Sequence, residues 1–144
     1  MILTLPVALF WLGAAASGLS DVAVEAHYEA PAKPGAPAAI VARLFPRSTD
    51  LRVNELPAPR LRLEPQSVLI DRQPKASAHV PVVDPEFARY LDTAGWLRFA
   101  VVPDPGTPRG IYTVPASLTF AYCSKKQGWC KKGVERIEVQ VTIP

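Results

Sequence analysis

The sequence predicts an all-β fold, an antiparallel β-sandwich, and three features of the chain support this. Apolar and polar residues alternate in several short segments, which is the pattern of strands with one buried and one exposed face. The 16 prolines among 144 residues are spread along the chain, where they separate these segments. Segments with helical periodicity are nearly absent. A chain of this length makes one domain, which we expect to span residues 19–144.

Two segments near the C-terminus show the clearest alternation. In Tyr112 to Tyr122 the even-numbered residues are apolar or aromatic, and in Val134 to Ile143 the apolar residues are Ile137, Val139, Val141 and Ile143. Each segment therefore predicts a strand with one face in the core. Pro115 indicates an edge position or a bulge in the first of them, because proline cannot donate to a strand ladder.

Weaker patterns predict the remaining strands. These are Val22 to Glu29, Ala38 to Phe45, Arg60 to Glu64, Ser67 to Ile70, Ser77 to Val82 and Trp96 to Val102. Pro85 to Leu91 could form one or two helical turns with Asp84 as the cap. Eight short strands with proline- and glycine-containing turns favour a sandwich of immunoglobulin-like type, and a Greek-key barrel is the alternative.

Residues 1–18 have the properties of a secretory signal peptide. Residues 1–16 are apolar almost throughout, no charged side chain precedes Asp21, and Ala14 to Ala16 are the small residues that a signal peptidase accepts. A short membrane anchor is the alternative, but crossing a bilayer takes about 20 apolar residues. We expect cleavage near Ser17 to Leu19, a mature domain with no membrane span, and a periplasmic or secreted location.

The net charge of +3 is modest, but cations gather near the cysteines as Lys125, Lys126, Lys131, Lys132 and Arg136. No helix rich in lysine and arginine and no RNA-binding aromatic motif accompanies them, so we expect no nucleic-acid partner. The simpler interpretation of this cluster is a solvated hairpin tip.

Cys123 and Cys130 lie between the two best strands, and an exported chain usually oxidises such a pair to a disulfide. Odd-numbered Cys123 and even-numbered Cys130 both fall on the outward phase of their strands, unless Gly133 forms a bulge that shifts the register. An accessible disulfide beside lysines suits thiol–disulfide exchange, since cations stabilise a thiolate. A structural role is the alternative, because closing so short a loop stabilises a fold by about 2.5 kcal/mol.

The segment from Gly110 to Cys130, with its strand ending in Tyr-Cys, its polar Gly-Trp loop and its second Cys, resembles the N-terminal domain of the thiol:disulfide interchange protein DsbD. It is also similar to related β domains of thioredoxin and NHL-repeat proteins. The runs Ile40 to Pro46 and Leu51 to Pro57 resemble the opening strands of that family and the loop after them.

The resemblance implies an immunoglobulin-like sandwich in which Cys123 and Cys130 are the redox-active pair. It implies no cofactor. The partner would be a separate thioredoxin-like or membrane redox protein, or another envelope protein. The segment Asp84 to Asp92, with Phe87 and Tyr90, is the candidate for the loop that shields the disulfide in DsbD. The alternative is an accessory or protein-binding module whose disulfide is only structural.

No other group of residues predicts a site as well. His27 lies on the polar phase of its strand, so we expect a surface histidine, and His79 is the only other one. We expect no metal site, because zinc ligands usually come in tighter pairs and oxidation of the cysteines would compete. Turn and cap roles explain Asp84 with Glu86 and Asp104 with Arg109. The aromatic residues Trp96, Trp129 and Tyr112 are expected to pack.

Overall fold

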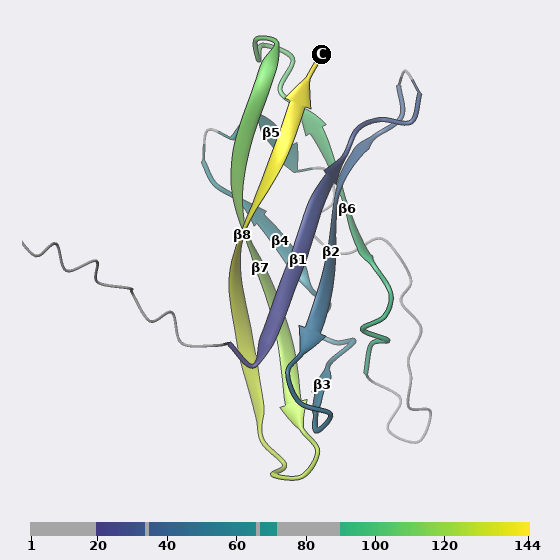
Figure 1. The fold of residues 1–144 in the computed structure, drawn as a ribbon, viewed down its shortest axis with the longest axis vertical. Coiled ribbons are helices and arrows are strands. Elements are labelled where there is room, and N and C mark those ends of the chain that lie inside the picture. The colour runs from purple at the N-terminus through teal and green to yellow at the C-terminus, as the bar shows by residue number, and fades with distance from the viewer. Residues whose placement is uncertain (1–19, 34, 66, 72–89) are drawn as a thin grey trace, which may run out of the picture.

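The two segments with the clearest alternation form the longest strands. The computed structural model describes residues 20–33, 35–65, 67–71 and 90–144, and all statements of structure below concern these residues. Strand β7 spans Gly110–Ser124 and strand β8 spans Cys130–Ile143. They pair antiparallel without interruption, from Gly110 opposite Ile143 to Cys123 opposite Cys130. This long hairpin runs the full height of the molecule (Figure 1).

Six shorter strands complete the described fold, and none of the described residues is helical. They are β1 (Val22–Glu29), β2 (Ala38–Pro46), β3 (Leu51–Val53), β4 (Arg60–Leu63), β5 (Leu69–Asp71) and β6 (Leu97–Pro103). In sheet A the strand order is β1-β2-β6-β5. In sheet B, β8 pairs with one side of β7, while β4 and then β3 pair with successive parts of its other side.

The two sheets pack face to face around one apolar core. Sheet A contributes residues such as Ile40, Phe99 and Val101, and sheet B contributes residues such as Leu118 and Val139, all at most 1% exposed. The even-numbered residues of β7 from Tyr112 to Tyr122 and the odd-numbered residues of β8 from Ile137 onward point into or pack against this core, as their alternation predicts. The prediction of an all-β antiparallel sandwich is therefore confirmed.

Gly133 does not form a bulge, which corrects the alternative register. It lies directly opposite Phe120 in an unbroken ladder. A Cβ atom at this position would overlap the Phe120 ring, so glycine leaves the space that the ring fills. Among the described strands, β8 is the only neighbour of Pro115, because β4 ends opposite Ala116. Its predicted edge position is correct for this part of β7.

Most other strand predictions are confirmed to within two residues at each end. Strand β3, Leu51–Val53, is not among the strands that the sequence pattern predicts. The predicted strand Ser77 to Val82, the signal peptide at 1–18, Asp84 and most of the helical turn after it lie outside the described residues. Among the described residues, no helix is long and apolar enough to span a membrane.

Candidate functional site: the hairpin disulfide

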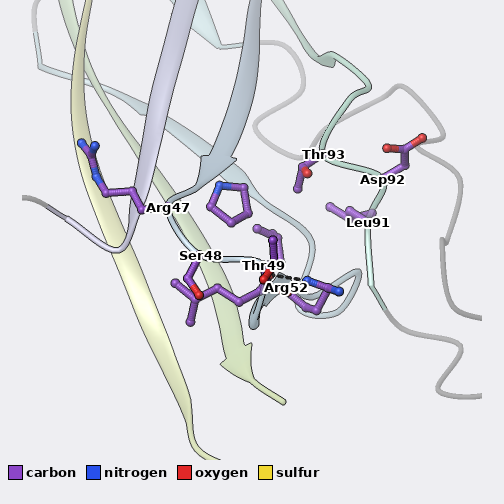
Figure 2. A pocket seen from close by; sticks show the side chains of 10 residues that line it. Arg47, Ser48, Thr49, Arg52, Leu91, Asp92 and Thr93 are labelled. Atoms are coloured by element: carbon purple, nitrogen blue, oxygen red, sulfur yellow. Dashed lines mark hydrogen bonds between the residues drawn. The ribbon is translucent and has the colours of Figure 1, made fainter. Parts of the chain in front are cut away.

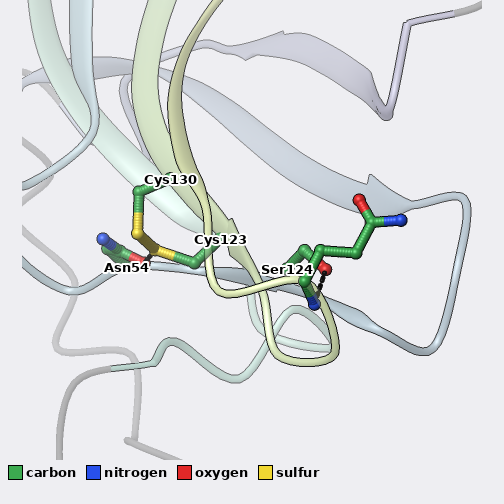
Figure 3. Close-up of a disulfide and its surroundings, with 5 residues drawn as sticks. Asn54, Cys123, Ser124 and Cys130 are labelled. Atoms are coloured by element: carbon green, nitrogen blue, oxygen red, sulfur yellow. Dashed lines mark hydrogen bonds between the residues drawn. A yellow bond between two sulfur atoms is a disulfide. The ribbon is translucent and has the colours of Figure 1, made fainter.

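The cysteine pair closes the end of the β7–β8 hairpin. Cys123 and Cys130 face each other in register, are joined by a disulfide, and have Cα atoms 4.0 Å apart (Figure 3). The Ser124 N–H donates to the Trp129 carbonyl at 2.9 Å, so these two residues form a hydrogen-bonded pair. The cysteines therefore occupy the adjacent non-hydrogen-bonded pair, where opposite side chains approach most closely. The predicted disulfide is confirmed.

The two cysteines differ in exposure. Both lie on the outward phase of their strands, as predicted, and Cys130 is exposed. Cys123, however, is only 6% exposed, so the expectation that it would be accessible is wrong. Its sulfur is in contact with Asn54, which directly follows β3 and lies 69 positions earlier in the sequence. An outside group can thus approach this disulfide from the Cys130 side.

Asn54 is the residue in contact with the buried sulfur. Its Oδ1 atom lies 3.3 Å from Cys123 Sγ (Figure 3). A disulfide sulfur carries no hydrogen, so this is a contact in the oxidised protein. In the reduced protein the Cys123 thiol could donate to the same oxygen. The Asn54 N–H donates to the Ala121 carbonyl at 2.8 Å, which fixes Asn54 against β7.

The described end of the proposed shielding segment lies beside Asn54. Tyr90 pairs with Asn54 in an isolated antiparallel bridge, and the Leu91 N–H donates to the Val53 carbonyl at 2.8 Å. Leu91 itself is buried in the core. Residues 84–89 of that segment, including Phe87, lie outside the described residues. Tyr90 and Leu91 therefore support β3 from the side opposite β7.

The turn between the cysteines is held by contacts that do not involve sulfur. The hydroxyl of Ser124, which is only 2% exposed, donates to the Asp50 carboxylate and accepts from the Gln127 N–H at 3.0 Å. The Lys126 N–H donates to Asp50 Oδ1 at 2.6 Å. The Ser124 hydroxyl first, and then the Lys126 N–H, hold the pKa of Asp50 below its ordinary value.

Aromatic residues fill the inner face of the hairpin tip. Trp129 packs edge-on against Tyr122 with ring centroids 5.8 Å apart, and Lys131 Nζ lies 4.3 Å from the Trp129 centroid. The Tyr122 hydroxyl donates to Asp21 Oδ2 at 2.7 Å. Burial and the Asp21 carboxylate raise the pKa of Tyr122 to about 12. The packing role predicted for Trp129 is confirmed.

A surface hollow of about 530 Å³ lies beside the exposed cysteine. Cys130 and Lys132 border it on β8, Thr119 and Ala121 form part of its floor on β7, and Arg60 lies on its far side. Lys125 and Lys126 are exposed in the turn, in agreement with a solvated tip. Lys132 is the lysine that shares both the outer phase of β8 and this hollow with Cys130.

A second hollow, of about 470 Å³, lies at the same end of the molecule (Figure 2). It is bordered by the turn after β2 and by Leu91 to Thr93. Arg52, the β3 residue opposite Cys123, donates its guanidinium hydrogens to the carbonyls of Thr49 and Leu51. These two bonds tie the Arg52 guanidinium to its own strand and to the turn before it.

The other predicted residues have the structural roles expected of them where they are described. His27 is on the surface, with its side chain 51% exposed. Asp104 Oδ1 accepts from the Gly106 N–H at 3.1 Å within a turn. The Tyr112 hydroxyl donates to the Pro108 carbonyl at 2.7 Å, and its ring packs against the core. Trp96 lies edge-on to His27 at 5.2 Å. His79 and Glu86 lie outside the described residues.

Sequence reasoning found the cysteines but missed three residues that shape their surroundings. Asn54, Asp50 and Ser124 contact a cysteine or hold the turn between them. A Ser-Thr-Asp run at 48–50 is typical of a turn, and a Ser directly after Cys123 was a visible polar residue at the end of a strand. Within the described part of the chain, no three or more His, Cys, Asp or Glu residues are grouped to hold a metal.

Comparison with known proteins adds no family to this description. No family model, no curated protein and no solved structure matches the chain. The geometry around Cys123 and Cys130 is therefore the basis for inferring a function.

Proposed function

We propose that this protein is a thiol–disulfide exchange module that acts through the Cys123–Cys130 pair. The observation that carries the proposal is the unequal exposure of the two cysteines across one strand pair. Exchange requires one sulfur that an outside thiolate can reach and a second sulfur that leaves. Cys130 suits the first role and Cys123 the second.

The reaction begins when a partner thiolate attacks Cys130 Sγ. The bond between the two cysteine sulfurs breaks, a mixed disulfide forms through Cys130, and Cys123 leaves as a thiolate that takes up a proton. Its thiol can then donate to Asn54 Oδ1, which lies 3.3 Å from the sulfur. A second thiolate of the partner attacks the partner's own sulfur and releases Cys130. Two electrons have then passed to this protein, and the partner dithiol has become a disulfide; the reverse sequence returns them.

The fold is suited to such a cycle because the hairpin has other means of support. The β7–β8 ladder continues up to the cysteines, and the turn between them is bonded to Asp50 through Ser124 and Lys126. Breaking the disulfide removes none of these hydrogen bonds. We expect reduction to leave the fold in place.

The wider context of the proposal comes from the sequence. The apolar residues 1–18 suggest export to the periplasm or outside the cell, where a cysteine pair meets an oxidising environment. The likeness of Gly110 to Cys130 to the N-terminal domain of DsbD suggests an immunoglobulin-like sandwich. It also suggests a separate thioredoxin-like or membrane redox protein, or another envelope protein, as the partner.

A structural disulfide in an accessory or protein-binding module is the second candidate. The observation in its favour is the burial of Cys123, since a covered sulfur is protected from attack. In that case the disulfide would stabilise the fold by about 2.5 kcal/mol through closure of the short loop.

The reduction potential of the pair distinguishes the two functions. For exchange we expect a value between about −120 and −270 mV, and for a structural disulfide a value below about −300 mV. Trapping provides a second measurement. Cys123→Ser should leave the exposed Cys130 able to form a mixed disulfide with an oxidised thioredoxin-like protein, whereas Cys130→Ser, which leaves only the buried Cys123, should trap little. A potential below −300 mV with no trapping by either variant would refute exchange.

A further inference from the structure

Cationic side chains border the outer face of β7 on both sides. Arg60 and Arg62 lie on β4, and Lys132 and Arg136 lie on β8. All four are exposed and occupy the outward phase of their strands. We call this surface of sheet B the basic face. It begins at Cys130 and extends along β7 away from the hairpin tip.

The floor of the basic face is made of small side chains. Ser117, Thr119 and Ala121 are half-buried residues of β7 and lie between the flanking cations. The hollow of about 530 Å³ occupies the end near Cys130. Another hollow, of about 250 Å³, reaches Ser117 from the side of β4. Small residues between long ones give a shallow furrow that ends at the accessible cysteine.

Most of these charges have no ion-pair partner among the residues that the structure describes. Within the described ranges, Arg60, Arg62 and Lys132 form no ion pair, and Arg136 is 3.9 Å from Glu64 in an exposed pair. Such an exposed pair contributes little to stability. A row of cations that the fold does not neutralise produces a positive potential, and this attracts an anionic partner.

We infer that the basic face docks an acidic segment of a partner protein and presents it to Cys130. A polypeptide fits better than a uniformly charged polymer, because apolar surface lies among the cations. Val134 is 58% exposed between Lys132 and Arg136, and Pro57 and Ala58 border the hollow. An acidic segment with apolar side chains matches both features. The covalent part of this inference rests on the proposed exchange function, but the docking itself does not.

A binding experiment without any thiol tests the docking. A short peptide of glutamate, aspartate and valine with one serine is titrated into the oxidised protein, and a lysine counterpart serves as the reference probe. We expect the acidic peptide to shift the amide NMR signals of Ser117, Thr119 and Ala121 at low ionic strength. Its affinity should exceed that of the lysine peptide by about tenfold and should fall as salt is added.

Charge-reversal variants locate the effect. Arg60→Glu with Lys132→Glu should abolish binding. The neutral pair Arg60→Gln with Lys132→Gln should weaken binding, and it provides the test if charge reversal disturbs folding. Lys33→Glu with Arg109→Glu is the matched control, since both residues are exposed and lie away from the basic face. The inference is overturned if control and face variants lose binding equally. It is also overturned if oligothymidylate or phosphatidylglycerol vesicles bind this face more tightly than the acidic peptide.

An exchange experiment then separates this inference from the proposed function. The serine in both peptides is replaced by two cysteines, so that each peptide can supply the second thiol, and the rate of disulfide reduction is measured. We expect the acidic peptide to react about tenfold faster, with the advantage lost in the face variant. If neither peptide reduces the disulfide while the serine peptide still binds, exchange is refuted and the docking surface stands. Equal rates, with no preferential binding of the acidic peptide, refute the docking surface and leave exchange intact.

Discussion

The two outer faces of the sandwich use their cations differently. On sheet A, Arg98 Nη1 is 2.5 Å from Glu29 Oε2, and His27 Nε2 is 3.7 Å from the other oxygen of Glu29. The Arg43 guanidinium lies over the Phe45 ring at 4.9 Å from its centroid. On the basic face of sheet B, cations such as Arg60 and Lys132 have no such partners among the described residues. The cations of sheet A contact other groups of the fold, whereas those of sheet B leave a positively charged surface exposed.

The largest effect should come from the inner side of sheet B. Gly133→Ala places a Cβ against the Phe120 ring, so the ring or the strand must move. We expect a loss of about 1–3 kcal/mol in the free energy of unfolding. Val134→Ala, one residue away on the outer face, should change it by less than about 0.5 kcal/mol. Chemical denaturation of both variants measures the difference. Equal losses would show that the outer face also supports the fold.

A smaller effect should distinguish the cations of the two outer faces. Arg98→Gln removes the contact with Glu29, and we expect only a small loss of stability because the pair is partly exposed. Arg62→Gln on the basic face should change stability by less than about 0.5 kcal/mol. A double-mutant cycle with Glu29→Gln isolates the Arg98 pair. A larger cost at Arg62 than at Arg98 would reverse the comparison.

The smallest effect appears only at high pH, at Tyr122 near the hairpin tip. The pKa of Tyr122 is raised to about 12, so its phenol stays neutral in the folded protein after an unfolded one would ionise at about pH 10. Its contribution to stability is complete below about pH 10 and is lost as the pH rises through about 12. Tyrosinate absorbance should show a titration near pH 12 that Tyr122→Phe removes. A titration unchanged by this substitution would contradict the assignment.

Much of the fold could be predicted because it depends on local alternation. The residues of β7 and β8 carry the period of two that one buried face imposes, and both strands form as expected. Strand β3 could not be predicted in this way, because three residues contain too little pattern. It exists because Leu51 to Val53 pair with the end of β7, a contact between distant parts of the chain.

In the candidate site, too, local features could be predicted from the sequence, whereas contacts between distant residues could not. The alternation of buried and exposed positions correctly placed Cys123 and Cys130 on the outward phase of their strands. Their position between two adjacent strands correctly predicted their disulfide. Alternation along one strand cannot predict which distant residues cover an outward-pointing side chain. Asn54, which contacts the buried Cys123 sulfur, lies 69 positions away in sequence. The basic face likewise needs the register of β4 with β7, since Arg60 and Lys132 are far apart in the chain.

The turn anchored by Asp50 has a kinetic consequence for a mixed disulfide. With the turn in place, Cys123 stays opposite Cys130 after their bond breaks, at Cα positions that are 4.0 Å apart in the oxidised protein. The two sulfurs then have a high effective concentration toward each other. Cys123 can attack the mixed disulfide again soon after it forms and expel the bound partner. Under the proposed exchange, a partner that cannot supply its own second thiol would be released unchanged, and the hairpin would favour dithiol partners over single thiols.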